Sequence, residues 1–189
     1  MIRSILFFIL CLLSLVMAKE LFKNIHGNVF ETPSWLFSSL NKEFEFTWDL
    51  ACLKENAKCK NYYTEKENSL AQEWHKLDGW LWLNPPYSPL RPWIEKAQLE
   101  NMLGARIVVL CPPIITTRYF QNYLPSEIRF LVGRIPFIKN GKEMKSNTND
   151  SCLLIYDNKV RQPKITYVER DTLKMKELNK PKTDGGMGR

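Results

Sequence analysis

The sequence predicts an α/β fold with a mostly parallel central sheet and flanking helices, and two observations support this prediction. Two compact apolar runs, Gly79 to Leu83 and Ala105 to Cys111, are each followed by a pair of prolines, which cannot continue a central strand. The segment between them, Pro92 to Leu103, has helical periodicity and is broken by Gly104. Strand, helix and strand at this spacing form a βαβ unit, which implies neighbouring parallel strands.

Four further elements are expected before this unit. Thr32 and Pro33 are typical of a helix start, with Thr32 as the cap and Pro33 as the first helical residue, so a helix is predicted over 34–44. Alternating β-forming residues over 44–48 predict a strand that ends at Asp49. The pattern also indicates a weaker strand over 61–64 and a short helix over 69–76.

The C-terminal part of the chain predicts two more strands, over 128–137 and 151–156, with a polar loop over 139–150 between them. Beyond them the sequence is rich in Lys and Arg. We therefore expect a single domain over 17–160 and a basic C-terminal tail over 161–189.

Length and composition limit the classes of protein that fit. A chain of 189 residues is long enough for one domain with a real core. Its 27 Lys and Arg against 20 Asp and Glu give a net charge of +7, which favours a polyanionic partner, although a soluble protein can be basic without one. The five Cys and two His lack the spacing of metal ligands, so we expect no metal site and reduced cysteines.

Residues 1–16 form an apolar run after Arg3 that is short for a membrane span and typical of a signal peptide. Taken alone, this leader favours secretion. Met17 begins a second plausible start, so the run is also explained as a wrongly assigned N-terminal extension. With the motifs below, we favour the extension and a cytoplasmic protein with no stable membrane partner. A secreted, non-enzymatic protein remains the alternative.

The strongest candidate for chemistry is the loop Asn84, Pro85, Pro86 and Tyr87, which follows the first apolar run. Ligand sites in open α/β sheets lie at the carboxyl ends of strands, and this loop has that position. Asn and Pro are also common turn residues, so the tetrapeptide alone fits a strand-terminating turn as well. The context of the loop decides between the two.

That context is an ordered series of short motifs: Thr32-Pro33-x-Trp35-Leu36-Phe37, Phe44-x-Phe46-x-x-Asp49-x-Ala51, Asn56-Ala57, Tyr62-Tyr63-Thr64, Ser69-Leu70, Trp74, Trp82-Leu83-Asn84-Pro85-Pro86-Tyr87-Ser88, Trp93-Ile94-x-Lys96-Ala97 and Gly133-Arg134-Ile135-x-Phe137. The series spans roughly residues 31 to 157. It resembles the phage DNA N6-adenine methyltransferase family, which are small Dam-like enzymes. The resemblance implies a Rossmann-like S-adenosylmethionine-dependent methyltransferase fold.

By this resemblance the chain is a site-specific DNA methyltransferase that transfers a methyl group from S-adenosylmethionine to the N6 amine of adenine. The adenine has to be flipped from the duplex, because its amine is otherwise paired and inaccessible. An enzyme of this kind, if phage-encoded, acts in the cytoplasm of the host cell. We expect it to act as a monomer.

The catalytic loop suits this reaction because the lone pair of the adenine amine is delocalised into the ring and is a poor nucleophile. The side-chain oxygen of Asn84 and the carbonyl of Pro85 can accept both amine hydrogens and localise the lone pair on the nitrogen. Pro85 presents a rigid carbonyl with no competing N–H, and Tyr87 offers a flat face for an extruded base. Transfer then depends on positioning and electrostatics.

The resemblance further implies cofactor binding by Thr32, Pro33, Asp49, Ala51 and Ser69. Asp49 ends a strand, where its carboxylate can meet the positively charged methionine end of the cofactor. A turn or capping aspartate is the alternative role for this residue.

Nucleic-acid binding is expected at Tyr87, Ser88, Arg134 and Phe137. Phe137 can pack against the flipped base opposite Tyr87, and a core position is an equal alternative. Arg134 can touch a phosphate or form a surface ion pair.

One departure from common methyltransferases is that residues 49–53 contain no glycine, so the usual glycine-rich cofactor loop is missing. Enzymes that methylate protein glutamine amides also use such N-P-P-Y loops, but usually carry that glycine-rich loop. RNA adenine as substrate also stays open. So does a fold that has lost its cofactor and survives as a DNA-binding module.

Overall fold

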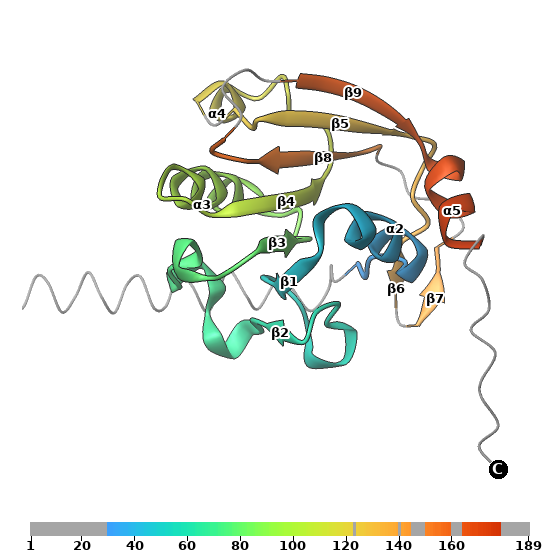
Figure 1. The fold of residues 1–189 in the computed structure, drawn as a ribbon, viewed down its shortest axis with the longest axis horizontal. Helices are drawn as coiled ribbons and strands as arrows, with labels where there is room; N and C mark the ends of the chain where they lie inside the picture. Colours follow the sequence, from blue (N-terminus) through green and yellow to red (C-terminus); the bar gives the residue numbers. More distant parts are fainter. Residues whose placement is uncertain (1–29, 123, 140, 145–149, 160–163, 179–189) are drawn as a thin grey trace, which may run out of the picture.

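The computed structural model describes residues 30–122, 124–139, 141–144, 150–159 and 164–178. In this part of the chain a seven-stranded sheet has the order β2-β1-β3-β4-β8-β5-β9 (Figure 1). Within this described sheet only β8 runs antiparallel to its neighbours, and the other strands are parallel. The strands are β1 (Phe46–Asp49), β2 (Asn61–Tyr62), β3 (Trp80–Leu83), β4 (Arg106–Cys111), β5 (Glu127–Val132), β8 (Ser151–Tyr156) and β9 (Lys164–Glu169).

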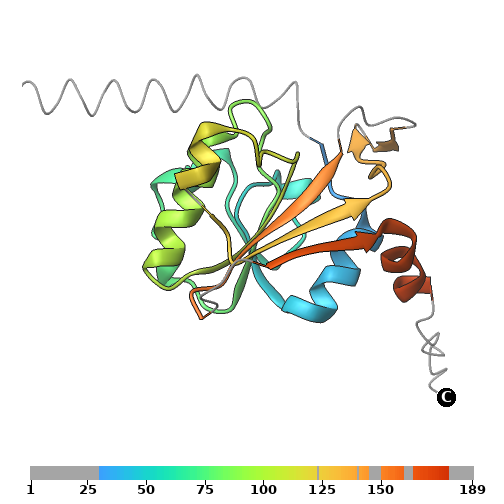
Figure 2. The same cartoon turned by 90° about the horizontal axis from the view of Figure 1, so that it is seen from above.

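Helices cover both faces of the sheet, which gives three layers (Figure 2). One face is covered by α3 and the 3-10 turn η5, and the other by α2 and α5. The helices and turns are α2 (Ser34–Phe44), η2 (Lys54–Asn56), η3 (Glu65–Glu67), η4 (Ser69–Ala71), η5 (Trp74–Lys76), α3 (Arg91–Met102), α4 (Arg118–Asn122) and α5 (Arg170–Leu178). The α/β fold with a mostly parallel sheet is confirmed.

The central strand β3 contributes side chains to both cores. Leu81 and Leu83 pack on the α3 side, whereas Trp80 and Trp82 pack on the α2 side, as the two-residue period of a strand requires. Strands buried on both faces have continuous apolar sequences, which explains the compact runs seen in β3 and β4.

The order of the first three strands creates the position of the site. The chain passes from β1 to β2 on one side of it, and then crosses to β3 on the other side. All three strands are parallel, so their carboxyl ends meet at one edge of the sheet. Where the strand order of a parallel sheet reverses in this way, a crevice forms outside the carboxyl ends of the strands, and ligands bind there in open α/β sheets.

The βαβ unit, helix 34–44 and the strands ending at Asp49 and Leu83 are confirmed. Thr32 does not cap α2, because Pro33 occupies the cap position and no side chain caps the helix. Residues 69–76 form two 3-10 turns, η4 and η5, and not one helix.

The expectations for the C-terminal part need three corrections. The strand predicted over 128–137 ends at Val132, because Gly133 has a φ of +91° and turns the chain. The loop expected over 139–150 contains the hairpin of β6 (Ile138–Lys139) and β7 (Lys142–Glu143). Within the expected tail 161–189, residues 164–178 form β9 and α5.

Long-range contacts explain the third correction. β9 is held by parallel pairing with β5, and Leu173 of α5 is buried against the α2 face. The leader 1–16 and residues 179–189 lie outside the described residues. Within the described ranges, no helix has the length and apolar character needed to cross a membrane.

The turn before β3 yields a stability prediction. Gly79 has a φ of +81°, and a Cβ there would lie 2.5 Å from Cγ2 of Thr47. We expect Gly79→Ala to lower the free energy of unfolding by about 2–4 kcal/mol, measured by urea denaturation. Gly141→Ala is the matched control, because Gly141 has a φ of +73° and nothing within 4 Å. Equal losses in both variants would contradict a steric origin.

Candidate active site

A pocket lies at the edge where β1, β2 and β3 end. It contains about 790 Å³ of space free of atoms, part of it open to solvent. Its walls come from the segment before α2, the turn after β1, the segment after β2, the turn η4, the loop after β3 and the first turn of α3. The pocket therefore occupies the position that the strand order predicts.

Asp49, the last residue of β1, is a buried acid in this pocket and is 2% exposed. Its two carboxylate oxygens accept hydrogen bonds from the backbone amides of Ala51 (3.3 Å) and Lys58 (3.0 Å). Burial raises the pKa of Asp49 to about 6, against the lowering effect of these hydrogen bonds and of the Lys58 charge. The carboxylate is thus charged at neutral pH and poorly solvated, which favours a cationic ligand.

Two charged residues that were not predicted from the sequence, Lys58 and Glu31, line the pocket together with Glu65. The Lys58 ammonium donates to the Glu31 carboxylate at 2.9 Å, and both side chains are largely shielded from solvent. They are 27 residues apart in the chain and belong to no recognisable motif, so only the fold reveals the pair.

Three of the other residues expected to bind the cofactor, Thr32, Ala51 and Ser69, line the pocket. Pro33, the cap residue before α2, is not part of the lining. Ser69 is 1% exposed, and among the described residues its hydroxyl has no hydrogen-bond partner. A buried hydroxyl without a partner is costly, and a ligand in the pocket can satisfy it.

All four residues of the predicted catalytic loop, Asn84, Pro85, Pro86 and Tyr87, line the pocket. The Asn84 side-chain nitrogen donates to the Phe30 carbonyl at 2.9 Å. This bond commits the nitrogen and leaves the side-chain oxygen as an acceptor. The segment around Phe30 is itself fixed, because Glu31 and Ile138 exchange two backbone hydrogen bonds.

Tyr87 is the last residue of the loop, and its ring and its hydroxyl have different surroundings. Its ring packs edge-on against the Phe137 ring, with centroids 6.2 Å apart. Its hydroxyl is buried, has no hydrogen-bond partner among the described residues, and has a pKa well above the usual range because of burial and the nearby thiols of Cys111 and Cys152. The hydroxyl therefore points into the core, and only part of the ring reaches the pocket.

The structure does not bring the remaining predicted DNA contacts into the pocket lining. Phe137 is 1% exposed and packs against the rings of Tyr87 and Phe30, so it is a core residue that supports the Tyr87 ring. Ser88 is exposed beside the loop, and Arg134 is exposed after β5, where its carbonyl accepts from Arg170. Direct contacts of these residues with DNA stay predictions.

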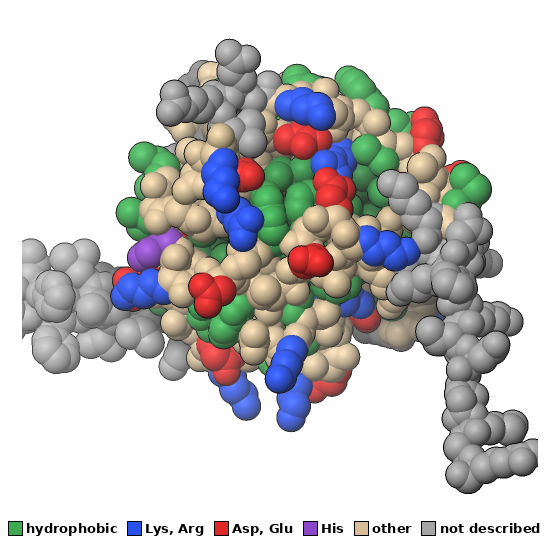
Figure 3. All heavy atoms as spheres, viewed as in Figure 1, with side chains coloured by type: hydrophobic (Ala, Val, Ile, Leu, Met, Phe, Trp, Pro, Cys, Tyr) green, Lys and Arg blue, Asp and Glu red, His purple; other side chains and the backbone are tan. Residues whose placement is uncertain are grey.

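Surface charges and candidate metal ligands are two further features of the described residues. Figure 3 shows Lys, Arg, Asp and Glu side chains interspersed on one face, without a single basic patch. Among the residues that the structure describes, no three His, Cys, Asp or Glu side chains could together hold a metal ion.

The sheet is mostly parallel, and the pocket lies at the carboxyl ends of its strands. A buried acid ends β1, and an N-P-P-Y loop follows β3, the neighbouring strand in the sheet. This is the architecture of an α/β methyltransferase.

Comparison with known proteins identifies the family. Residues 20–179 match the family model described as DNA N-6-adenine-methyltransferase (Dam), and the chain belongs to this family. It is similar to the DNA N-6-adenine-methyltransferase of Haemophilus phage HP1, with 29% identity over 85% of this chain and 98% of the relative. A DNA N-6-adenine-methyltransferase of Escherichia phage T1 is 29% identical over 68% of this chain and 62% of the relative. The putative methyltransferase YfdM of Escherichia coli K12 is 39% identical over 35% of this chain and 75% of the relative.

The charges in the pocket yield a prediction that needs no ligand. Because the positive charge of Lys58 lowers the pKa of Asp49, Lys58→Met should raise that pKa above about 6. The measurement is an NMR titration of the aspartate side-chain carbons. Lys76→Met is the control, since Lys76 pairs with Glu73 on the surface. An unchanged Asp49 titration in Lys58→Met would contradict the coupling.

Proposed function

We propose that this chain, a DNA adenine methyltransferase by family, takes its methyl group from S-adenosylmethionine bound in the pocket. It transfers the methyl group to the adenine amine, which Asn84 holds in place. The observation that carries this proposal is the placement of Asp49 and Asn84 at the ends of paired parallel strands, facing one pocket. Family membership supports the reaction and the substrate.

The pocket residues fit the cofactor. When bound, S-adenosylmethionine supplies a methyl group on a positively charged sulfur. The Asp49 carboxylate offers a negative charge to the positively charged groups at the methionine end of the cofactor. Lys58 offers a positive charge to the carboxylate of the cofactor. The Ser69 hydroxyl offers a hydrogen bond, and the apolar wall around Trp93 offers surface for an aromatic ring.

Asn84 and Pro85 prepare the adenine amine. The Asn84 oxygen accepts one amine hydrogen, and the Pro85 carbonyl accepts the other, which draws the lone pair onto the nitrogen. The hydrogen bond from Asn84 to the Phe30 carbonyl supports this role, because it fixes which end of the amide faces the pocket. Rigid placement of both acceptors lowers the entropic cost of reaching the reactive geometry.

The adenine enters the pocket after it is extruded from the duplex. Tyr87 stacks on the extruded base, and Phe137 holds the Tyr87 ring from the side away from the pocket. Ser88 and Arg134 are exposed and are therefore available to contact the DNA backbone. We further propose that the protein acts as a monomer in the cytoplasm, where DNA and cofactor are available.

The first prediction from this function concerns Asn84. Asn84→Ala should reduce kcat by at least about 10²–10³-fold, because one of the two acceptors for the amine is lost. The measurement is N6-methyladenine in nucleosides digested from DNA, quantified by mass spectrometry. Asn122→Ala is the control, since Asn122 is exposed on α4, away from the pocket lining.

Thermal unfolding establishes that the Asn84 variant is folded. Wild-type rates of N6 methylation in folded Asn84→Ala would refute the proposed role. A folded wild type that binds S-adenosylmethionine but makes no product on DNA would redirect the search to RNA adenine or glutamine amides.

The second prediction concerns pH. Because the pKa of Asp49 is about 6, its carboxylate is about nine-tenths charged at pH 7 and only about one-tenth charged at pH 5. A cationic ligand requires the charged form, so S-adenosylmethionine affinity should fall about tenfold from pH 7.5 to pH 5. Calorimetry measures it. Asp49→Asn should bind more weakly at pH 7.5 and lose most of this pH dependence; the same dependence in that variant would exclude Asp49 as its source.

A further inference from the structure

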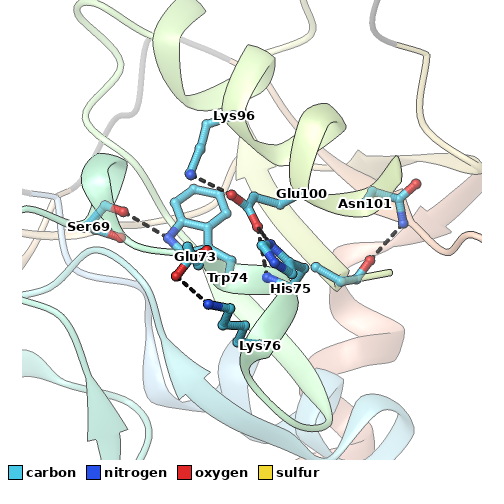
Figure 4. Close-up of polar contacts among 9 residues, drawn as sticks. Ser69, Glu73, Trp74, His75, Lys76, Lys96, Glu100 and Asn101 are labelled. Carbon is cyan, nitrogen blue, oxygen red and sulfur yellow. Dashed lines mark hydrogen bonds and ion pairs between the residues drawn. The ribbon is translucent and has the colours of Figure 1, made fainter. Parts of the chain in front are cut away.

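A buried carboxylate on α3, Glu100, has no part in the site described above, yet it makes three close polar contacts (Figure 4). One carboxylate oxygen accepts the His75 backbone amide at 2.8 Å and lies 2.7 Å from the His75 ring nitrogen Nδ1. The other oxygen accepts from the Lys96 ammonium. The residue is 4% exposed and is absent from the pocket lining.

The groups that Glu100 holds surround Trp74. His75 is the next residue in the chain, and the Lys96 ammonium lies 5.6 Å from the Trp74 ring centroid. A cation over an indole face is attracted by the ring, most strongly where water is excluded. Trp74 is therefore fixed from its backbone side through His75 and from its ring face through Lys96.

Trp74 in turn contacts two residues that line the pocket. Its indole nitrogen donates to the Ser69 carbonyl at 2.9 Å, and its ring stacks beside the Trp93 ring with centroids 6.4 Å apart. Ser69 and Trp93 are both wall residues. The fully buried Trp74 therefore links α3 to η4, which forms part of the pocket wall.

The charge of Glu100 is maintained despite its environment. Burial alone would raise its pKa, but hydrogen bonds from Lys96 and from the backbone and ring of His75 outweigh burial and lower the pKa. A buried carboxylate with these partners holds its neighbours through charge-assisted hydrogen bonds, which are shorter and stronger than neutral ones.

We propose that Glu100 is a positioning residue for the cofactor wall: through Lys96, His75 and Trp74 it holds Ser69 and Trp93 in the geometry that binds S-adenosylmethionine. This inference rests on the proposed function. Glu100 touches neither Asn84 nor the pocket, so its loss changes cofactor affinity and leaves the methyl-transfer step nearly intact.

The test compares full-length wild type with Glu100→Gln, which keeps the size of the side chain and one acceptor oxygen but removes the charge. Calorimetric titration with S-adenosylmethionine and with S-adenosylhomocysteine gives Kd, and methylation of DNA gives KM and kcat. We expect Kd and the cofactor KM to rise about tenfold, the order of a weakened buried charge-assisted hydrogen bond, with kcat changed less than about twofold.

Two further variants separate positioning from general stability. Glu73→Gln removes an exposed ion pair with Lys76 one residue before Trp74 and should leave Kd unchanged. Lys96→Met should raise Kd like Glu100→Gln, and the double variant should be no worse than the weaker-binding single variant, because both residues act through one contact. Lys96→Met also tests the proposal if Glu100→Gln does not fold.

The outcomes are distinct. Wild type that does not bind S-adenosylmethionine would overturn the proposed function and the inference with it. Wild type that binds, together with a folded Glu100→Gln of equal affinity, would overturn the inference alone. A parallel loss of kcat and affinity with a lowered Tm, or independent effects of the two substitutions, would show that Glu100 is only structural.

Discussion

The parallel pairing of β1 with β3 is the interaction on which the site depends. Asp49 is paired with Trp82, so the two strands end at nearly the same level and their following residues face one crevice. The prolines after Leu83 cannot donate to a neighbouring strand, so the chain leaves the sheet there and the loop is free to form one wall. The buried acid and the amide oxygen therefore share a pocket, although they come from distant parts of the sequence.

A second set of contacts decides how Asn84 is presented. Its nitrogen donates to the Phe30 carbonyl, and Glu31, the residue after Phe30, is paired with Ile138 of the β6–β7 hairpin. The segment before α2, the catalytic loop and the hairpin therefore form one connected structure. Because the hairpin follows Phe137, which supports Tyr87, both the amide and the aromatic side of the loop depend on it.

The sequence predicted what local pattern encodes, namely the βαβ unit, the strand ends and the N-P-P-Y loop. Asp49 and Ser69 were found through family motifs, and the fold places both in the pocket. Lys58 and Glu100 were missed because the contacts of Lys58 with Glu31 and of Glu100 with His75 span 25 or more residues and leave no local pattern. The basic composition beyond residue 160 concealed β9, whose stability comes from pairing with β5.

The missing glycine-rich loop has a structural explanation. The carboxylate of Asp49 accepts the amides of Ala51 and Lys58, so the side chain itself folds the turn after β1. None of residues 50–53 has a positive φ, so a glycine is not required there. The same carboxylate that shapes the turn also charges the pocket. Asp49 holds only the turn after β1, and the pocket wall at Ser69 is held by other contacts. Lys96 of α3 lies over the Trp74 ring, and Trp74 donates to the Ser69 carbonyl.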